Sequence, residues 1–319
     1  MILSISRRTD IPAFYTPWLL QRLREGFVLV RNPMNYHQVS KVSLAPEVVD
    51  GIVFWSKNPA PLLPHLPEIG KKYPFYLQYT LTGYGKDIEP CLPSVEERLG
   101  TMLRVAEQCG TDKVVWRYDP VLLTEKYNVA WHKANFDRLA AALADKVDTC
   151  VFSLLDVYPK IEKNLCRQQV RTCTAEETAE LAAHFARTAA AHGIRLQSCA
   201  EAVDLASYGI SHGSCIDGER LSRLCGYELN AKKDKNQRAE CGCLESIDLG
   251  QYNTCRHGCL YCYANFNEKS VQTLSARHDP ASPLLIGRTE PADKVTERKM
   301  KSLRTGKRIG GEQLELFGE

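Results

Sequence analysis

Seven short apolar runs, rich in β-branched and aromatic residues, recur along the chain with helical patterns between them. The runs cover residues 2–6, 51–55, 75–81, 113–118, 149–155, 194–199 and 246–250. Several are apolar without alternation, which is typical of strands buried on both faces of a parallel sheet. Alternating strands and helices form right-handed βαβ units, so the sequence predicts an α/β protein with a parallel sheet.

Two of the stretches between these runs have clear helix boundaries. Residues 94–110 begin with an S-x-x-E capping box, residues 174–193 begin with T-x-x-E, and both stretches end at glycine. Six or seven strand–helix units can curve into a partial (β/α) barrel, which we predict for residues 1–225. Residues 226–266 are rich in cysteine and are predicted to complete the barrel. Residues 267–319 show no clear strand or long amphipathic helix, and we expect a partly flexible extension.

The composition is that of a globular protein, with 44% hydrophobic and 25% charged residues. No segment approaches eighteen consecutive apolar residues, and the N-terminus lacks the features of a signal peptide. We therefore predict a cytoplasmic protein that does not bind membranes. The net charge of +3 gives no global field that would attract nucleic acid.

Polar residues follow the predicted strands, where the carboxyl ends of a parallel barrel form the active-site face. The candidates for this face are Arg7, Arg8, Lys57, Asn58, Arg117, Asp119 and Glu201. Arginines there could hold a substrate carboxylate or phosphate in bidentate fashion. Any one of these residues could instead be a helix cap or turn residue, as Asp119 before proline illustrates.

Three closely spaced cysteines follow the last predicted strand with the spacing C-x3-C-x2-C, at Cys255, Cys259 and Cys262. A structural zinc site is closed by four ligands. Three thiolates can instead hold three irons of a [4Fe–4S] cluster and leave the fourth iron open for a small molecule. The alternative is zinc, with a fourth ligand from His257 or from the upstream ECGC sequence.

The triplet, with the aromatic Tyr261 just before Cys262, resembles the motif of the radical SAM enzymes. The resemblance implies that the three thiolates hold a [4Fe–4S] cluster and that Tyr261 lies near the adenine of S-adenosylmethionine. Asn58 is a further candidate for cofactor binding, and Asp119 or Glu201 could accept the ribose or the amine. The resemblance to the radical SAM enzymes also implies a partial barrel. It implies that S-adenosylmethionine is cleaved by one electron to a 5'-deoxyadenosyl radical, and that a protein such as flavodoxin or ferredoxin donates this electron.

The position of the motif departs from most of that superfamily, in which it follows the first strand. Here it follows residues 246–250, so the chain resembles a rearranged or permuted barrel. A more specific resemblance, to the DUF1848 family, covers almost the whole chain. It is carried by SISRRTDIPAFY, FWSKNP, WRYDP, CAE, CIDG and CGCLESIDLGQYNTCRHGCLYCYAN. It implies no known substrate.

Four more cysteines form a second set that is complete in number: Cys199, Cys215, Cys241 and Cys243. Because many radical SAM enzymes carry an auxiliary cluster, a second [4Fe–4S] cluster is the first expectation for them. Structural zinc is the second, and buried unligated thiols are the third.

The chain ends in GGEQLELFGE, and residues 313–317 resemble the pentapeptide that docks bacterial proteins on the sliding clamp. Residues 287–308 carry eight Lys or Arg against three acidic residues and could touch phosphate. Both features also fit a chance match and a solvated surface.

Two functions therefore remain open. The first is a radical SAM enzyme that acts on an unknown small-molecule or nucleic-acid substrate. The alternative is a non-catalytic iron–sulfur or zinc protein in redox sensing or nucleic-acid binding.

Overall fold

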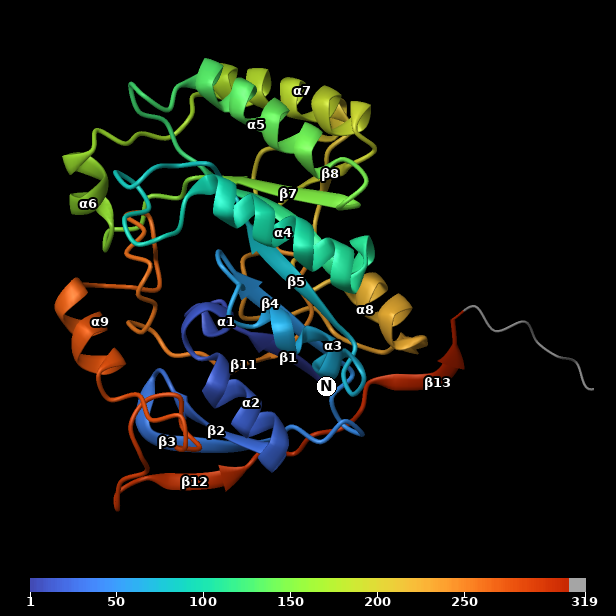
Figure 1. The fold of residues 1–319 in the computed structure, drawn as a ribbon, viewed down its shortest axis with the longest axis vertical. Helices are drawn as coiled ribbons and strands as arrows, with labels where there is room; N and C mark the ends of the chain where they lie inside the picture. Colours follow the sequence, from blue (N-terminus) through green and yellow to red (C-terminus); the bar gives the residue numbers. More distant parts are fainter. Residues whose placement is uncertain (310–319) are drawn as a thin grey trace, which may run out of the picture.

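The computed structural model describes residues 1–309, which are built around an eight-stranded sheet (Figure 1). All neighbouring strands in this sheet are parallel, in the order β11-β1-β4-β5-β6-β7-β8-β9. The strands are β1 (Ile2–Ile5), β4 (Gly51–Ser56), β5 (Phe75–Thr80), β6 (Val114–Val121), β7 (Thr149–Leu154), β8 (Arg195–Ser198), β9 (Ser211–His212) and β11 (Ile247–Asp248). The sheet is not closed, because β11 and β9 form its two edges.

The predicted α/β architecture with a parallel sheet is confirmed, and all seven predicted strands belong to this sheet. The prediction missed β9, which has only two residues and therefore no recognisable period. The last predicted strand, β11, pairs with the first, β1, through Leu3 opposite Ile247 and Ser4 opposite Asp248. This pairing carries the cysteine loop to the carboxyl end of the strand that begins the chain.

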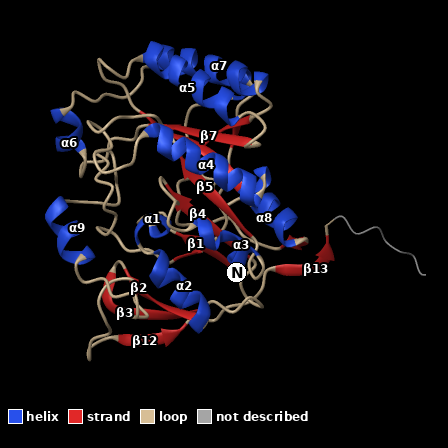
Figure 2. Cartoon of the chain, viewed as in Figure 1, coloured by secondary structure: helices blue, strands red, loops and turns tan. Residues whose placement is uncertain are grey.

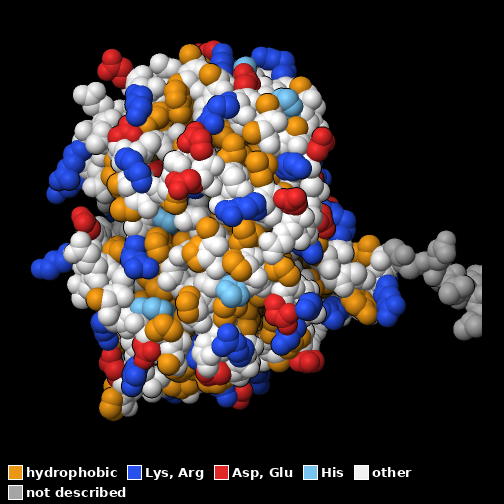
Figure 3. Space-filling view, in the orientation of Figure 1, with side chains coloured by type: hydrophobic (Ala, Val, Ile, Leu, Met, Phe, Trp, Pro, Cys, Tyr) orange, Lys and Arg blue, Asp and Glu red, His pale blue; other side chains and the backbone are white. Residues whose placement is uncertain are grey.

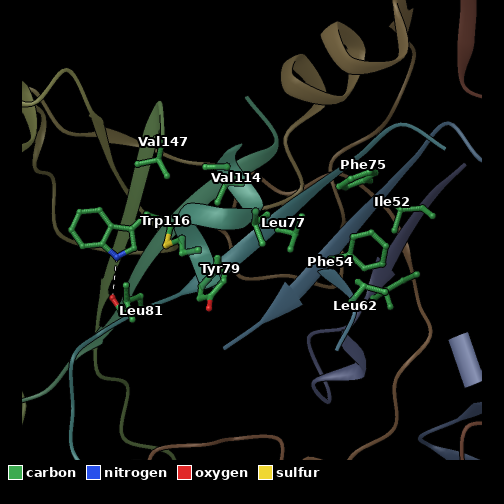
Figure 4. Close-up of a cluster of buried hydrophobic side chains, with 14 of the residues drawn as sticks. Ile52, Phe54, Leu62, Phe75, Leu77, Tyr79, Leu81, Val114, Trp116 and Val147 are labelled. Atoms are coloured by element: carbon green, nitrogen blue, oxygen red, sulfur yellow. Dashed lines mark hydrogen bonds between the residues drawn. The ribbon is translucent and has the colours of Figure 1, made fainter. Parts of the chain in front are cut away.

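Helices cover one face of the sheet (Figure 2). They are α2 (Thr16–Glu25), α4 (Val95–Cys109), α5 (Val129–Leu143) and α7 (Ala175–Ala191). The predicted capping boxes begin α4 and α7. In the core between the layers, the ring of Trp116 stacks on Phe136 at 4.9 Å, and Phe136 stacks on Phe185 at 4.1 Å. The Trp116 indole N–H donates to the Leu81 carbonyl at 2.9 Å (Figure 4).

Alternate strand residues face the other side of the sheet, because side chains along a strand point to opposite faces. Val53, Tyr76 and Val115 pack there against a second buried group that includes Ile216 and Leu221. Leu221 belongs to α8 (Gly218–Cys225). This face is therefore covered by the loops and the short helix that also bring in four cysteines.

The remaining elements lie around this centre. The helices are α1 (Ile11–Phe14), α3 (Leu66–Gly70), α6 (Glu162–Arg167) and α9 (Glu268–Ser275). The strands β2 (Phe27–Asn32), β3 (Asn35–Ser43) and β12 (Lys294–Glu297) form a small sheet, and β10 (Tyr227–Leu229) pairs with β13 (Arg304–Arg308).

The C-terminal extension differs from the expectation, because it contains α9, β12 and β13. All residues of β12 and β13 are exposed, so these strands lack the apolar alternation by which a sequence reveals a strand. They form because distant strands, β3 and β10, offer free edges. The clamp-like pentapeptide 313–317 lies outside the described residues. Among residues 1–309, no helix combines the length and the apolar character that crossing a membrane requires.

A buried histidine in this fold gives a pH-dependent prediction. His132 is fully buried, with Nε2 2.8 Å from the Leu122 carbonyl and Nδ1 2.9 Å from the Tyr118 hydroxyl. Burial lowers the pKa of His132 to about 4, from 6.5. Because the folded state resists protonation, stability is lost as the pH falls from 6.5 towards 4, by up to about 3 kcal/mol.

We expect the His132→Gln variant to lack this loss. We subtract the free energy of unfolding of the variant from that of wild type. This value should fall by about 3 kcal/mol when the pH is lowered from 7 to 4, because only wild type contains the histidine. Urea denaturation of both proteins at the two pH values measures this difference. A difference that does not change with pH would contradict the prediction.

Candidate functional site

A cavity of about 530 Å³ lies at the carboxyl ends of the sheet strands. Most of the predicted site residues line it together, although they come from distant parts of the sequence. They are Arg7, Arg8, Lys57, Arg117, Asp119, Tyr261 and the seven cysteines at positions 199, 215, 241, 243, 255, 259 and 262. The cavity therefore combines a thiol-rich wall with a set of cationic side chains.

Two predicted site residues, Asn58 and Glu201, do not line this cavity. Asn58 lies in the turn after β4, where its backbone N–H donates to Ser56 Oγ at 3.0 Å. Glu201 accepts a hydrogen bond from the Leu154 backbone N–H at 2.8 Å, and burial raises the pKa of Glu201 to about 7. Both residues follow strands as expected, but the Asn58 side chain accepts from the Ala60 N–H at 3.4 Å and the Glu201 side chain bonds the backbone of β7.

The cysteine loop is joined to the N-terminal strand through Asp248. The Asp248 carboxylate accepts hydrogen bonds from Ser4 Oγ at 2.8 Å, Ser6 Oγ at 2.5 Å and the Arg7 backbone N–H at 2.8 Å. A Cβ atom at Gly250 would overlap the Ser6 side chain, so only glycine permits this close approach. Asp248 thus fixes the Arg7 segment beside the loop that begins after β11.

The three thiols of the triplet come from this loop and line the same cavity. Burial raises the pKa of the thiols of Cys255, Cys259 and Cys262. Backbone groups of Ala264 and Asn265 lie beside the Cys262 sulfur and favour its ionised form. Hydrogen bonds from the backbone to sulfur are a feature of iron–sulfur sites, so the donor set and its surroundings fit a thiolate-bound cluster.

Asp10 connects the cysteine loop to two other elements. Its Oδ1 accepts hydrogen bonds from the Ala13 N–H at 2.9 Å and from Ser56 Oγ at 2.8 Å. Its Oδ2 accepts from the Lys57 N–H at 2.8 Å and lies 2.8 Å from His257 Nε2, inside the loop. One buried carboxylate therefore caps α1, fixes the end of β4 and orients the loop.

Because several buried donors depend on it, Asp10 is expected to matter for stability. Asp10→Ala should lower the free energy of unfolding by about 3 kcal/mol, since each buried donor left without a partner costs about 1–3 kcal/mol. The exposed Glu107 on α4 offers a control, and Glu107→Ala should change stability by no more than about 0.5 kcal/mol. Equal stability of the two variants in urea would show that the Asp10 contacts are dispensable.

A second buried carboxylate, Glu89, holds the same loop from the other side. Lys57 Nζ donates to Glu89 Oε1 at 3.0 Å, Arg98 Nη1 lies 3.1 Å from Oε2, and the Tyr261 hydroxyl donates to Oε1. Burial opposes ionisation of Glu89, but the charges of Lys57 and Arg98 outweigh it and lower the pKa. The Leu260 N–H also donates to the Ile88 carbonyl at 3.1 Å, so the cysteine loop is tied to the segment between β5 and α4.

The second set of cysteines lies beside a buried ion pair. The Arg117 guanidinium donates to Cys215 Sγ at 2.8 Å and, through Nε, to the Asp119 carboxylate at 3.0 Å. The pKa of Asp119 is lowered overall. Burial alone would raise it, but the charge of Arg117 outweighs the effect of burial. The Cys199 and Cys215 sulfurs are 3.1 Å apart. A hydrogen bond with Cys243 lowers the pKa of the Cys241 thiol to about 7.

Within residues 1–309, no group of three or more His, Cys, Asp or Glu side chains is gathered closely enough to hold a metal ion as it stands. Such close gathering of the ligands is required when they all bind a single ion. The thiolates of a cubane cluster bind different irons and lie farther apart than the ligands of one ion.

The cationic side chains of the cavity contact aromatic rings as well as carboxylates. Arg7 lies 5.9 Å from the ring centre of Trp55 and 3.9 Å from the Asp234 carboxylate. Arg8 lies 5.3 Å from the ring centre of Tyr252. Because these contacts leave guanidinium N–H groups free to donate, the two arginines could bind an anionic group.

Sequence reasoning missed several residues of this site. Asp10 was not among the predicted site residues, and Glu89, Asp248 and Trp55 were not considered. Asp248 had a signal, since it is the one charged residue within the predicted strand 246–250, just before the cysteine loop. Glu89 had none, because it lies in a loop without periodic pattern between β5 and α4.

Comparison with known proteins gives one family match. A family model described as "Domain of unknown function (DUF1848)" matches residues 2–264. No curated protein and no solved structure matches the chain. The matched range includes both cysteine sets and the strands that line the cavity.

Proposed function

This chain belongs to the DUF1848 family, and we propose that it is a radical SAM-type enzyme with a [4Fe–4S] cluster on Cys255, Cys259 and Cys262. One observation carries the proposal. Three thiols of a single loop open onto a cavity that is large enough for a substrate and lined by cations. When bound, such a cluster supplies the electron that cleaves S-adenosylmethionine and starts hydrogen abstraction.

The strand order supports a rearranged barrel of the radical SAM type. Starting from β11, which precedes the cysteine loop, the sheet continues through β1, β4, β5, β6, β7, β8 and β9 in chain order. Helices α2, α4, α5 and α7 all cover the same face. A parallel sheet with helices on one face is the arrangement of a (β/α) barrel, and the open edges correspond to a partial one.

The residues of the cavity suit binding and positioning of the reactants. Tyr261, which donates to Glu89 and whose ring centre lies 5.2 Å from Lys57 Nζ, is the residue we propose to contact the adenine. Arg7 and Arg8, which line the same cavity, could hold a carboxylate or phosphate. Asp119, fixed by Arg117, could accept a ribose hydroxyl or the amine. Asn58 and Glu201 are not required for these contacts, because they do not line the cavity.

The cations of the cavity favour an anionic substrate, either a small molecule or a nucleic acid. On the face shown in Figure 3, Lys and Arg side chains are interspersed with Asp and Glu rather than gathered. That face offers no continuous basic track for an extended polynucleotide. All thirteen cysteines are free, which suits a reducing compartment such as the cytoplasm and an electron donor of the flavodoxin or ferredoxin class.

The test is an anaerobic assay on the purified protein. After reconstitution with iron and sulfide, reduction and addition of S-adenosylmethionine, the amount of 5'-deoxyadenosine is measured by chromatography. Product formation that depends on the reductant is the expected result. Bound iron without any 5'-deoxyadenosine would move the assignment to a non-catalytic iron–sulfur protein, and zinc in place of iron to a zinc protein.

A further inference from the structure

Four of the ten cysteines outside the triplet meet at one place on the wall of the cavity. Cys199 follows β8, Cys215 precedes α8, and Cys241 and Cys243 come from the loop before β11. The Cys199 and Cys215 sulfurs are 3.1 Å apart, and hydrogen bonds between thiols join Cys215 to Cys243 and Cys243 to Cys241. Three separate segments thus present four sulfurs to each other.

We propose that Cys199, Cys215, Cys241 and Cys243 together bind a single zinc ion through four thiolates, and that this site is separate from the cluster of the triplet. The proposal does not depend on the proposed function. It chooses between the two metals that four thiolates commonly hold, an auxiliary [4Fe–4S] cluster and zinc.

The spacing of the Cys199 and Cys215 sulfurs favours a single ion over a cubane. With Zn–S bonds of about 2.3 Å in tetrahedral geometry, the sulfurs of one site lie about 3.8 Å apart. The 3.1 Å between Cys199 and Cys215 is close to that value. In a cubane the two sulfurs would bind different irons, and both side chains would have to separate. To bind zinc, the thiols need only turn towards a common centre, where they are not yet gathered.

The surroundings are suited to the charge of such a site. Four thiolates and one Zn²⁺ carry two net negative charges, which are costly to bury without a counter-charge. Arg117, only 5% exposed, donates to Cys215 Sγ at 2.8 Å, and the Ile216 N–H donates to Cys243 Sγ at 3.4 Å. Hydrogen bonds of this kind orient metal ligands and compensate their charge.

Gly242 allows the segment of Cys241 and Cys243 to lie close to the segment of Cys215. A Cβ atom at Gly242 would overlap Ser214 Oγ, so a side chain between Cys241 and Cys243 would push the two segments apart. A closed four-thiolate site leaves no open coordination position, so its role is structural. It would join β8, the segment before α8 and the loop before β11 into one wall of the cavity, on the sheet face that lacks long helices.

The experiment measures the metal directly, on full-length protein in which Cys255, Cys259 and Cys262 are all alanine. Elemental analysis should give one zinc and no iron per chain, and X-ray absorption should give four Zn–S distances of about 2.3 Å. Adding Cys215→Ser should remove the zinc. Adding Cys109→Ser instead, a half-buried cysteine at the end of α4, should leave it in place.

Two results would overturn the proposal. If the triplet variant, reconstituted with iron and sulfide, takes up four irons that Cys215→Ser removes, the site holds a cluster. If it binds neither zinc nor iron, the four cysteines are buried thiols. Because the triplet is absent from all these proteins, neither result depends on cleavage of S-adenosylmethionine. The X-ray absorption of the triplet variant also remains informative if the Cys215 variant fails to fold.

Discussion

Replacing Glu89 by alanine is expected to lower the free energy of unfolding by about 3–5 kcal/mol. The Glu89 carboxylate is fully buried and neutralises two cations, Lys57 at 3.0 Å and Arg98 at 3.1 Å. Without it, the buried Arg98 guanidinium has lost its counter-charge, which is the costly way to break a buried ion pair. Urea denaturation with circular dichroism measures the loss.

A matched control is offered by Glu96, an exposed glutamate on α4 that lies 3.7 Å from Arg138. Glu96→Ala should change stability by no more than about 0.5–1 kcal/mol, because exposed ion pairs contribute little. Glu89→Gln keeps the shape and removes the charge, so it should lie between wild type and Glu89→Ala. If Glu89→Ala were as stable as Glu96→Ala, Glu89 would not be the anchor that holds Tyr261 and its loop.

Replacing Cys259 by alanine is expected to abolish formation of 5'-deoxyadenosine. The proposed cluster has only three thiolate ligands from the loop, so the loss of one leaves two irons without protein ligands. We expect at least a hundredfold loss of product, together with loss of the iron bound by the triplet. Chromatography of the reaction and elemental analysis of the same sample measure both.

The control for Cys259 is Cys91, an exposed cysteine whose backbone N–H donates to the His257 carbonyl of the same loop at 3.2 Å. Cys91→Ala leaves that backbone contact unchanged and should retain both iron and product. Retention of full activity by Cys259→Ala would show that the triplet does not hold the catalytic cluster. Equal loss in both variants would indicate damage to the loop rather than to a ligand.

Several strands of the sheet were predictable because they are continuous apolar runs buried on both faces. Ile52, Val53 and Phe54 illustrate this, since neighbours along β4 pack into different buried groups on opposite faces. The exposed strands β12 and β13 were not predictable, because their pairing is decided by partners more than 70 residues away and their side chains contact solvent.

The same logic applies to the site. The carboxyl ends of parallel strands meet at one edge, so Arg7, Lys57 and Arg117 could be expected to lie together, and the structure brings them to one cavity. Hydrogen bonds to the backbone decide where the other two side chains lie. Asn58 is held by the Ala60 N–H and Glu201 by the Leu154 N–H of β7, and neither lines the cavity. The spacing of the sulfurs depends on three distant segments and has no counterpart in the sequence.

The most direct test of the central claim is electron paramagnetic resonance of the reduced, reconstituted protein, with and without S-adenosylmethionine. An open iron in a cluster bound by Cys255, Cys259 and Cys262 predicts a [4Fe–4S]⁺ signal whose g-values shift when S-adenosylmethionine binds. The triplet variant should show no such signal. A wild-type cluster signal that S-adenosylmethionine leaves unchanged, or the absence of any iron–sulfur signal, would contradict the assignment.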